Sequence, residues 1–156
     1  MTFTYILGRK ASIVIVELFL KRPTTEMSLS YIIEKTKLSK LSVMRWTKEM
    51  KKTGILTAKM YGRSSLYRLN RSSAFAKQLL ILYNVGQLSD KIKKIRIENA
   101  QIFLFGSFAR GENEENSDID ILAIGNDRSV INKLKSLDDR IKVSFYTPLE
   151  WSMSSR

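Results

Sequence analysis

Apolar residues in the first half of the chain are spaced for three helices. Residues 12–20 are almost continuously apolar and are predicted as a buried helix, although the run Ile-Val-Ile-Val within them also suits a strand. Two later segments, 29–37 and 40–53, carry apolar residues every three or four positions. Ser28 and Ser39 stand just before these segments, where a serine hydroxyl can cap the first helical turn. The pattern therefore predicts a helix followed by two shorter, capped helices.

The segment after the third helix has the pattern of a hairpin. Gly54 is predicted to follow the last helical turn in the left-handed conformation. Two short runs, 55–60 and 65–70, then flank a turn that contains Gly62. Within the third helix, the positions expected to pack in the core are Val43, Trp46 or Thr47, and Met50, and Met44 is also expected to pack.

A long amphipathic segment joins the two halves of the chain. Residues 73–97 are predicted as one helix, in which Gly86 costs about 1 kcal/mol relative to alanine. Its apolar stripe consists of Phe75, Leu79, Leu82, Val85, Leu88, Ile92 and Ile95. Such a stripe can pack on neighbouring modules or on its own copy in a dimer, and we expect both.

The last third of the chain alternates short apolar runs with polar breaks. Residues 101–105, 119–125 and 141–147 are predicted as strands, and residues 130–137 as a helix between the second strand and the third. The first strand ends at Gly106, and the residues that follow can begin a short helix. This alternation is typical of a small α/β module.

Charge divides the chain into two parts. Residues 1–98 carry 20 Lys and Arg and 6 Asp and Glu, a net charge of +14, whereas residues 99–156 carry 7 and 9, a net charge of −2. The basic part suggests a polyanion such as nucleic acid as its partner, and a solvated lysine-rich surface is the alternative. The two parts therefore look like modules with different partners.

The chain contains neither cysteine nor histidine. Without cysteine there are no disulfides and no thiolate metal sites, which is typical of a cytoplasmic protein. Without histidine, catalysis has to use carboxylates, lysine, tyrosine, hydroxyls or a metal held by oxygen atoms, and oxygen ligands favour Mg²⁺, Ca²⁺ or Mn²⁺. No apolar run is long enough for a transmembrane helix, and no signal peptide or membrane partner is expected.

The order of elements over residues 9–71 resembles a winged helix-turn-helix domain. The stretch "LSKLSVMRWTKEMKKTGIL" is similar to the recognition helix of that family followed by the first strand of its wing. The resemblance implies that this helix enters the major groove of double-stranded DNA and that the wing contacts the backbone or the minor groove. By position it implies DNA contacts from Ser39, Lys40, Ser42, Arg45 and Arg63, with Arg45 suited to guanine edges and the others to phosphates.

Two carboxylates, Asp118 and Asp120, stand where the second predicted strand of the acidic part begins. Side chains two positions apart on a strand share a face, about 7 Å from one another, so these two would repel unless solvated or bridged by cations. Gly106 and Ser107, at the end of the preceding strand, offer backbone amides and a hydroxyl to phosphate oxygens. Metal ions between carboxylates and phosphates would satisfy both sets of groups.

These residues resemble the nucleotidyltransferase superfamily of DNA polymerase beta, in particular its minimal nucleotidyltransferase branch. The match covers about residues 101–147: a Gly-Ser pair, ten residues, then Asp118-Ile119-Asp120, with Ala-Arg-Gly and a serine between them. The resemblance implies transfer of a nucleoside monophosphate from ATP or another NTP to a hydroxyl, with release of pyrophosphate. It implies that the nucleotide is bound by Gly106, Ser107 and Arg110, and that Asp118 and Asp120 are the catalytic ligands of Mg²⁺ or Mn²⁺.

The sequence departs from this family on the third strand. There the family places a third carboxylate, which helps to hold the metal and activates the acceptor hydroxyl. The aligned residue here is Ser144, with Lys142 on the same face, while Asp138 and Asp139 precede the strand. Nucleotide and metal binding are therefore better supported than transfer.

Two functions stay open. The first is a DNA-binding nucleotidyltransferase that modifies a protein or RNA hydroxyl. The resemblance implies an antitoxin-like role, because relatives of this branch act as antitoxins beside HEPN-type toxins, some by adenylylating the toxin. The second is a transcriptional regulator whose degenerate transferase domain only binds a nucleotide or a partner. In fold we expect an α/β protein of the α+β type, forming a homodimer. It comprises a winged helix-turn-helix (1–72), a linker and dimerisation helix (73–98), and a small nucleotidyltransferase-like mixed sheet with helices (99–156).

Overall fold

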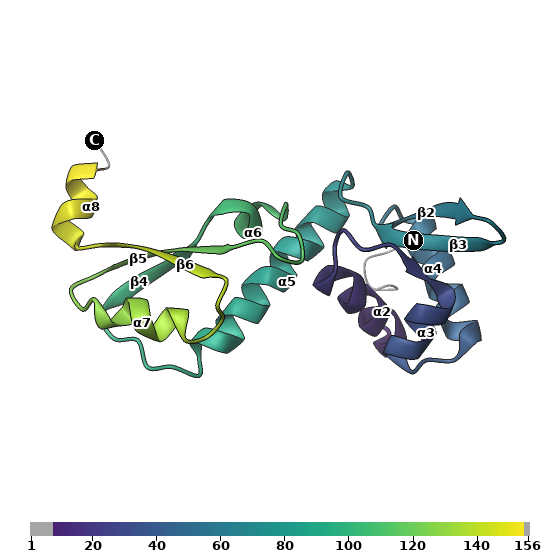
Figure 1. Ribbon diagram of the computed structural model, residues 1–156, viewed down its shortest axis with the longest axis horizontal. Coiled ribbons are helices and arrows are strands. Elements are labelled where there is room, and N and C mark those ends of the chain that lie inside the picture. The colour runs from purple at the N-terminus through teal and green to yellow at the C-terminus, as the bar shows by residue number, and fades with distance from the viewer. Residues whose placement is uncertain (1–7, 155–156) are drawn as a thin grey trace. The chain divides into compact units, whose positions relative to one another are not determined.

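The computed structural model describes residues 8–154, which form an α+β protein. The chain divides into two compact units between Leu80 and Ile81, inside the long helix that was predicted as a linker. Each unit has its own three-stranded sheet (Figure 1). Within the described residues, no helix is long and apolar enough to cross a membrane.

From residue 8 onward, the first unit consists of three helices, a two-residue strand, a hairpin and the start of a further helix. Its elements in chain order are α2 (Lys10–Lys21), β1 (Met27–Ser28), α3 (Leu29–Thr36), α4 (Lys40–Lys52), β2 (Leu56–Tyr61), β3 (Ser64–Leu69) and the first turns of α5 (Ala74–Ile92). The strands lie in the order β1-β3-β2, and both pairs are antiparallel. Residues 12–20 are therefore helical, as predicted, whereas the two-residue strand β1 was not predicted.

Local signals in the sequence set the ends of these helices. The Ser28 hydroxyl accepts a hydrogen bond from the backbone N–H of Tyr31, and the Ser39 hydroxyl accepts one from Ser42, each at 3.2 Å. Gly54 follows α4 with a φ of +73°. Both predicted caps and the predicted left-handed glycine are confirmed.

The core of the first unit lies where the three helices meet the sheet. Its fully buried side chains include Ile15, Phe19, Ile32, Val43, Met50 and Ile55. Trp46 and Thr47 are also buried, but Met44 is 46% exposed, so the prediction that Met44 packs is wrong. The buried stripe of α4 is centred on Val43, Thr47 and Met50, and Met44 lies beyond its edge.

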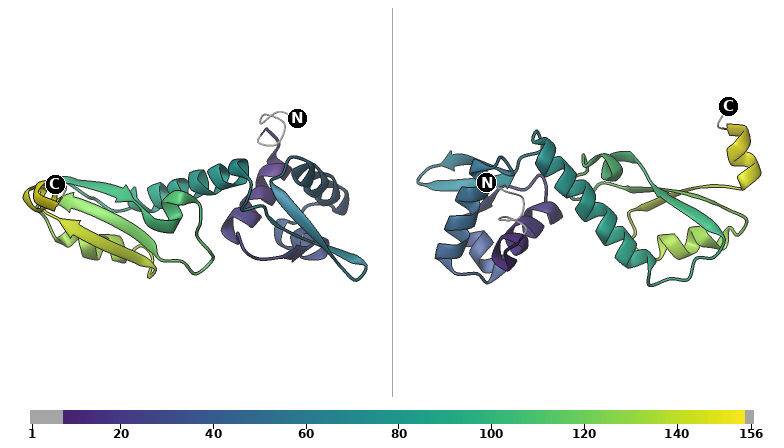
Figure 2. Two further views of the ribbon diagram at one scale, coloured as in Figure 1. Left: turned by 90° about the horizontal axis from the view of Figure 1, so that it is seen from above. Right: turned by 180° about the vertical axis from the view of Figure 1, so that it is seen from behind.

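The second unit is a small mixed sheet with helices. After α5 its elements are β4 (Ala100–Leu104), α6 (Gly106–Arg110), β5 (Ile119–Gly125), α7 (Ser129–Lys135), β6 (Ile141–Tyr146) and α8 (Pro148–Ser154). The strands lie side by side in the order β4-β5-β6, with β4 antiparallel and β6 parallel to β5 (Figure 2). All three predicted strands are found, within a residue of their predicted ends.

One face of this sheet carries the core. Ile119, Ile121 and Ala123 of β5 pack there with Leu88 of α5, and the same cluster contains Phe108, Val130, Leu134 and Ile141. Because side chains alternate along a strand, Asp120 lies on the opposite face of β5. That opposite face is where the candidate site is found.

One prediction about a helix needs correction, and one helix was not predicted. The long helix ends at Ile92 rather than at residue 97, and the chain then turns, with bonds from Lys94 and Ile95 three residues back. This turn lets Ile95 and Ile97 pack against the core of the second unit. The helix α8 was not predicted at all.

The start of α8 carries a signal that the sequence does contain. The Thr147 backbone N–H donates to the Glu150 carboxylate at 2.7 Å, and the Glu150 N–H donates to the Thr147 hydroxyl at 3.2 Å. This reciprocal pair is a capping box, and Pro148 fits the first helical position because its missing N–H would have had no partner there. The spacing Thr-x-x-Glu could therefore have predicted this helix.

Candidate functional site

A close contact between two segments forms the centre of the candidate site. The backbone N–H of Phe105, at the end of β4, donates to the carbonyl of Asp120 at 3.0 Å. The next residue, Gly106, has a φ of +69°, and a Cβ atom there would lie only 2.1 Å from Asp120 Oδ2. The carboxylate of Asp120 therefore rests directly on the backbone of Gly106, a position that only glycine can occupy without rearrangement.

The contact brings together the two motifs that the sequence singled out. Asp118 is exposed just before β5, whereas Asp120 and Ser107 are half-buried. Within residues 8–154, the two carboxylates and the Ser107 hydroxyl have no hydrogen-bond or ion-pair partner. The carboxylate oxygens are thus available to a hard cation such as Mg²⁺, and the hydroxyl is available to donate to a phosphate oxygen.

The neighbouring strand supplies no third carboxylate. In the register of the parallel pair, Asp120 lies beside Lys142 and Leu122 lies beside Ser144, on the face of the sheet that points away from the core. Among the described residues no group of three acidic side chains could hold a metal ion. Two carboxylates still fit Mg²⁺, which commonly uses one or two protein carboxylates together with substrate phosphates.

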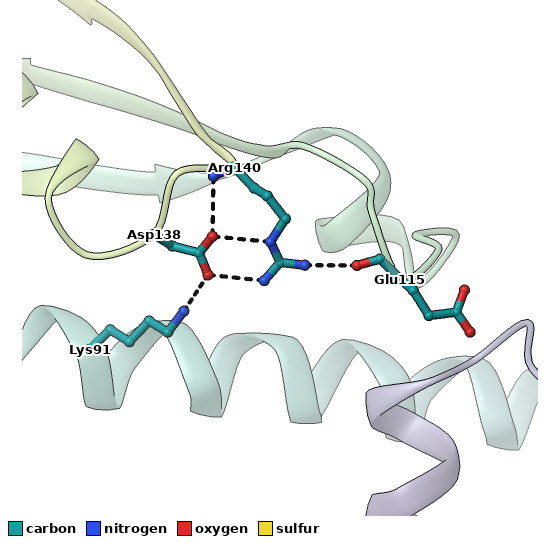
Figure 3. Close-up of polar contacts among 4 residues, drawn as sticks. All are labelled: Lys91, Glu115, Asp138 and Arg140. Carbon is teal, nitrogen blue, oxygen red and sulfur yellow. Dashed lines mark hydrogen bonds and ion pairs between the residues drawn. The ribbon is translucent and has the colours of Figure 1, made fainter.

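Asp138 is committed to other partners, so it does not replace the missing acid. Its two carboxylate oxygens accept hydrogen bonds from Nε and Nη2 of Arg140, at 3.0 and 2.9 Å, and Lys91 of α5 also donates to it (Figure 3). These bonds hold the pKa of Asp138 well below its ordinary value of 3.8, and the bonds from Arg140 make the largest contribution. Partial burial of the carboxyl acts in the opposite direction and raises the pKa. Asp138 is therefore a structural anchor at the start of β6.

Arg110 occupies the last position of α6. Its Nε donates to Glu112 at 2.7 Å, and both side chains are largely exposed. The predicted role of Arg110 in holding a nucleotide stays a prediction.

A buried polar cluster supports α6. Asn84 of α5 donates to the carbonyl of Phe108 at 2.9 Å and to Oδ1 of Asn113 at 2.7 Å, and both asparagines are 4% exposed. Sequence reasoning missed this cluster, because the contacts join residues 24 and 29 positions apart. An asparagine within an otherwise apolar stretch of a predicted helix was the available signal.

The residues predicted to contact DNA lie on α4 and in the hairpin turn. Ser39 caps α4, Lys40 and Arg45 are exposed, Ser42 is half-buried, and Arg63 is exposed between β2 and β3. The guanidinium of Arg45 stands over the ring of Trp46 at 5.5 Å.

The outward face of α4 also contains residues that sequence reasoning did not name. Leu41, Arg45, Lys48 and Lys52 follow one another at spacings of four, three and four residues, so they share the side opposite Val43 and Met50. Leu41 is 78% exposed, and Lys52 pairs with Glu49 at 3.3 Å. The face is thus basic, with one apolar side chain at its beginning.

One comparison with known proteins agrees with the class predicted for the second unit. Residues 85–152 match the family described as "Nucleotidyltransferase domain". A solved structure from M. tuberculosis, described as "Crystal structure of M.tuberculosis Rv0081", is similar with 20% sequence identity and a TM-score of 0.44, over 58% of this chain and 89% of that chain. No curated protein matches the chain.

Residues 85–152 are thus similar to a nucleotidyltransferase domain. This range begins inside α5 and includes Gly106, Ser107, Asp118 and Asp120. The nucleotidyltransferase part of the predicted resemblance is therefore confirmed, and the winged helix-turn-helix part stays a prediction.

Proposed function

We propose that the second unit binds ATP or another NTP together with Mg²⁺ or Mn²⁺. The backbone of Gly106 and the hydroxyl of Ser107 hold the triphosphate, and Asp118 and Asp120 hold the metal. The observation that supports this proposal is the contact of Asp120 Oδ2 with the backbone of Gly106, because a carboxylate then lies beside the turn that we propose to bind the phosphates. The metal supplies charge neutralisation between the carboxylates and the phosphates.

The reaction of this class of domain is nucleotidyl transfer, and we propose it for this protein with a protein or RNA hydroxyl as acceptor. The family match supports the reaction type. The test is incubation of the full chain with ATP labelled at the α-phosphate, Mg²⁺ and candidate acceptors. Label transferred to an acceptor by the wild type, and not by Asp120→Asn, is the expected result; release of no pyrophosphate with any acceptor would contradict it.

A second candidate function is nucleotide binding without transfer, as in a transcriptional regulator with a degenerate domain. Ser144 favours it, because the register leaves that side of Asp120 without a third acid to activate a hydroxyl. Ser144→Asp distinguishes the two candidates. If the wild type binds nucleotide but transfers none, and the variant binds Mn²⁺ more tightly, the degenerate-domain function holds; transfer by the wild type at an ordinary enzymatic rate excludes it.

For the first unit we propose a winged helix-turn-helix that binds double-stranded DNA. Support comes from two short helices, a hairpin and the antiparallel order β1-β3-β2, together with the basic outward face of α4. The charge of residues 1–72, 15 Lys and Arg against 4 Asp and Glu, favours a polyanion. The full chain should bind DNA with an affinity that falls steeply with salt, and an absence of binding at low salt would contradict the proposal.

We also propose two protein partners, a second copy of this chain and a toxin protein. Helix-turn-helix proteins commonly read two half-sites as dimers, so we propose a homodimer, with Leu82 and Val85 as exposed apolar side chains on α5. A HEPN-type toxin is the proposed acceptor if the protein acts as an antitoxin. Light scattering of the chain alone, then with such a toxin, tests each partner separately.

A further inference from the structure

Arg140 forms hydrogen bonds with the backbone on both sides of Asp118. The Nη1 atom of Arg140 donates to the carbonyl of Glu115 at 2.9 Å, three residues before Asp118. The carbonyl of Arg140 accepts from the backbone N–H of Ile119 at 2.9 Å, immediately after Asp118. One residue thus fixes the backbone on both sides of this carboxylate.

The segment needs such support because it lacks regular structure. Residues 111–118 form neither helix nor strand between α6 and β5. Within this stretch, the Glu114 N–H donates to the Ser117 hydroxyl at 2.8 Å, a contact that shapes the loop without tying it to the sheet. The guanidinium of Arg140 does tie it to the sheet, at the beginning of β6.

The guanidinium is itself held in one orientation. Asp138 accepts two parallel bonds from it and a third from the Arg140 backbone N–H at 3.1 Å, and Lys91 holds the same carboxylate from α5 (Figure 3). The guanidinium also lies over the ring of Phe108, 5.9 Å from its centre, and Phe108 belongs to the helix that begins with Gly106 and Ser107. Arg140 therefore contacts both the segment before Asp118 and the helix that begins with Gly106 and Ser107.

We propose that Arg140 is a positioning residue for the metal–nucleotide site: it holds Asp118 within reach of the ligand that Asp120 also binds. The proposal rests on the proposed metal and nucleotide binding of the second unit. Arginine suits this role because its planar fork donates in several fixed directions at once, here to two oxygens of Asp138 and to the Glu115 carbonyl. A lysine ammonium keeps the charge but lacks this fork.

The first test measures Mn²⁺ affinity, by electron paramagnetic resonance, for the full chain and three variants. Arg140→Gln should weaken Mn²⁺ binding about 10- to 100-fold, the usual effect of losing a residue that orients a metal ligand. Arg140→Lys should remain weak, because the charge alone does not replace the fork. Arg128→Gln is the matched control: Arg128 stands over the ring of Phe145 at 5.6 Å and is exposed, so its loss should leave the affinity unchanged.

The second test needs no metal, and measures amide hydrogen exchange in the metal-free proteins. In Arg140→Gln the amides of residues 115–119 should exchange faster, while those of Ile121 and Ala123 in the core of β5 should keep their wild-type rates. Unchanged exchange at residues 115–119 would overturn the proposal. Equal acceleration at Ile121 and Ala123 would also overturn it, because Arg140 would then only stabilise the unit as a whole.

The two tests separate failure of this inference from failure of the proposed function. A wild type that binds no Mn²⁺, alone or with ATP, would refute metal binding and with it the role of Arg140 at a metal site, whereas the exchange result would still show whether Arg140 holds residues 115–119 in place. If the wild type binds Mn²⁺ and Arg140→Gln binds it equally well, Arg140 is an ordinary ion-pair residue and the proposal fails. If Arg140→Lys restores full affinity, the charge rather than the fork is responsible, and positioning by the fork is refuted.

Discussion

The two units of this protein carry their candidate residues in opposite ways. In the first unit these residues stand on the outside of regular elements, where helix periodicity alone places Arg45 and Lys48 on one face of α4. In the second unit the site depends on a contact between distant segments, in which Asp120 rests on the backbone of Gly106. A single substitution in the first unit should therefore weaken DNA binding only in part, whereas one at the contact in the second unit should abolish ligand binding.

Two glycines offer the sharpest form of this comparison. Gly106 has a positive φ and a carboxylate against its backbone, whereas Gly62, in the hairpin turn, has a φ of +57° but no atom within 4 Å of the place where a Cβ would stand. Alanine at position 62 should cost about 1–2 kcal/mol of unfolding free energy for the left-handed conformation alone. Gly106→Ala should cost more and should also abolish metal-dependent ATP binding, because Asp120 must move.

Chemical denaturation and ATP titration of both variants check this prediction. The double variant Gly106→Ala with Asp120→Ala should recover part of the lost stability, because the clash is then removed. Equal stability losses for Gly62→Ala and Gly106→Ala, with ATP binding intact in both, would contradict the close contact.

The graded behaviour of the first unit can be tested on α4. Arg45→Ala should cost about 1–3 kcal/mol of binding free energy at a preferred DNA site and should relax the preference at one base pair. Lys40→Ala should weaken binding about equally on all sequences and lower the slope of log affinity against log salt by about 1. Fluorescence anisotropy at several salt concentrations measures both quantities, and identical behaviour of the two variants would argue against base contact by Arg45.

Acid should reveal the contribution of Asp138 to the second unit. The pKa of this carboxyl is lower in the folded protein than its ordinary value of 3.8, so its contribution is fully present above about pH 4 and is lost as the pH falls further. At neutral pH Asp138→Asn should lower the unfolding free energy by about 1–2 kcal/mol, since its cationic partners are partly exposed. Denaturation at pH 7 and pH 3 should show that the difference in unfolding free energy between the wild type and Asp138→Asn is smaller at pH 3. A larger difference at pH 3 would contradict a lowered pKa of Asp138 in the folded protein.

The smallest effect is expected at Gly86 of α5. This glycine has neither a positive φ nor an atom within 4 Å of the position a methyl group would take. Gly86→Ala should therefore raise the unfolding free energy by about 0.5–1 kcal/mol, because alanine favours the helix and restricts the unfolded chain. Thermal unfolding checks the shift, and a loss of stability would show that the space beside Gly86 is filled in solution.

The same contrast explains which parts of the structure the sequence could predict. The strands β4, β5 and β6 are short apolar runs between strong breaks, and the caps Ser28 and Ser39 act within one helical turn, so local patterns find both. The network around Arg140 was not predicted, because Glu115 lies 25 positions from Arg140, Lys91 lies 47 positions from Asp138, and no local pattern links them. The end of α5 was missed for a similar reason, since Ile95 fits the helical stripe but packs on the core from a turn.

The central claim is that Gly106, Ser107, Asp118 and Asp120 form one site for a metal and a nucleotide. The most direct measurement is calorimetric titration of ATP into the full chain, with and without Mg²⁺, for the wild type and for Asp118→Asn combined with Asp120→Asn. We predict saturable binding that requires Mg²⁺ in the wild type and is lost in the double variant, with the metal-free stability of the variant equal to that of the wild type or higher. Equal ATP binding by both proteins, or none by the wild type, would contradict the claim.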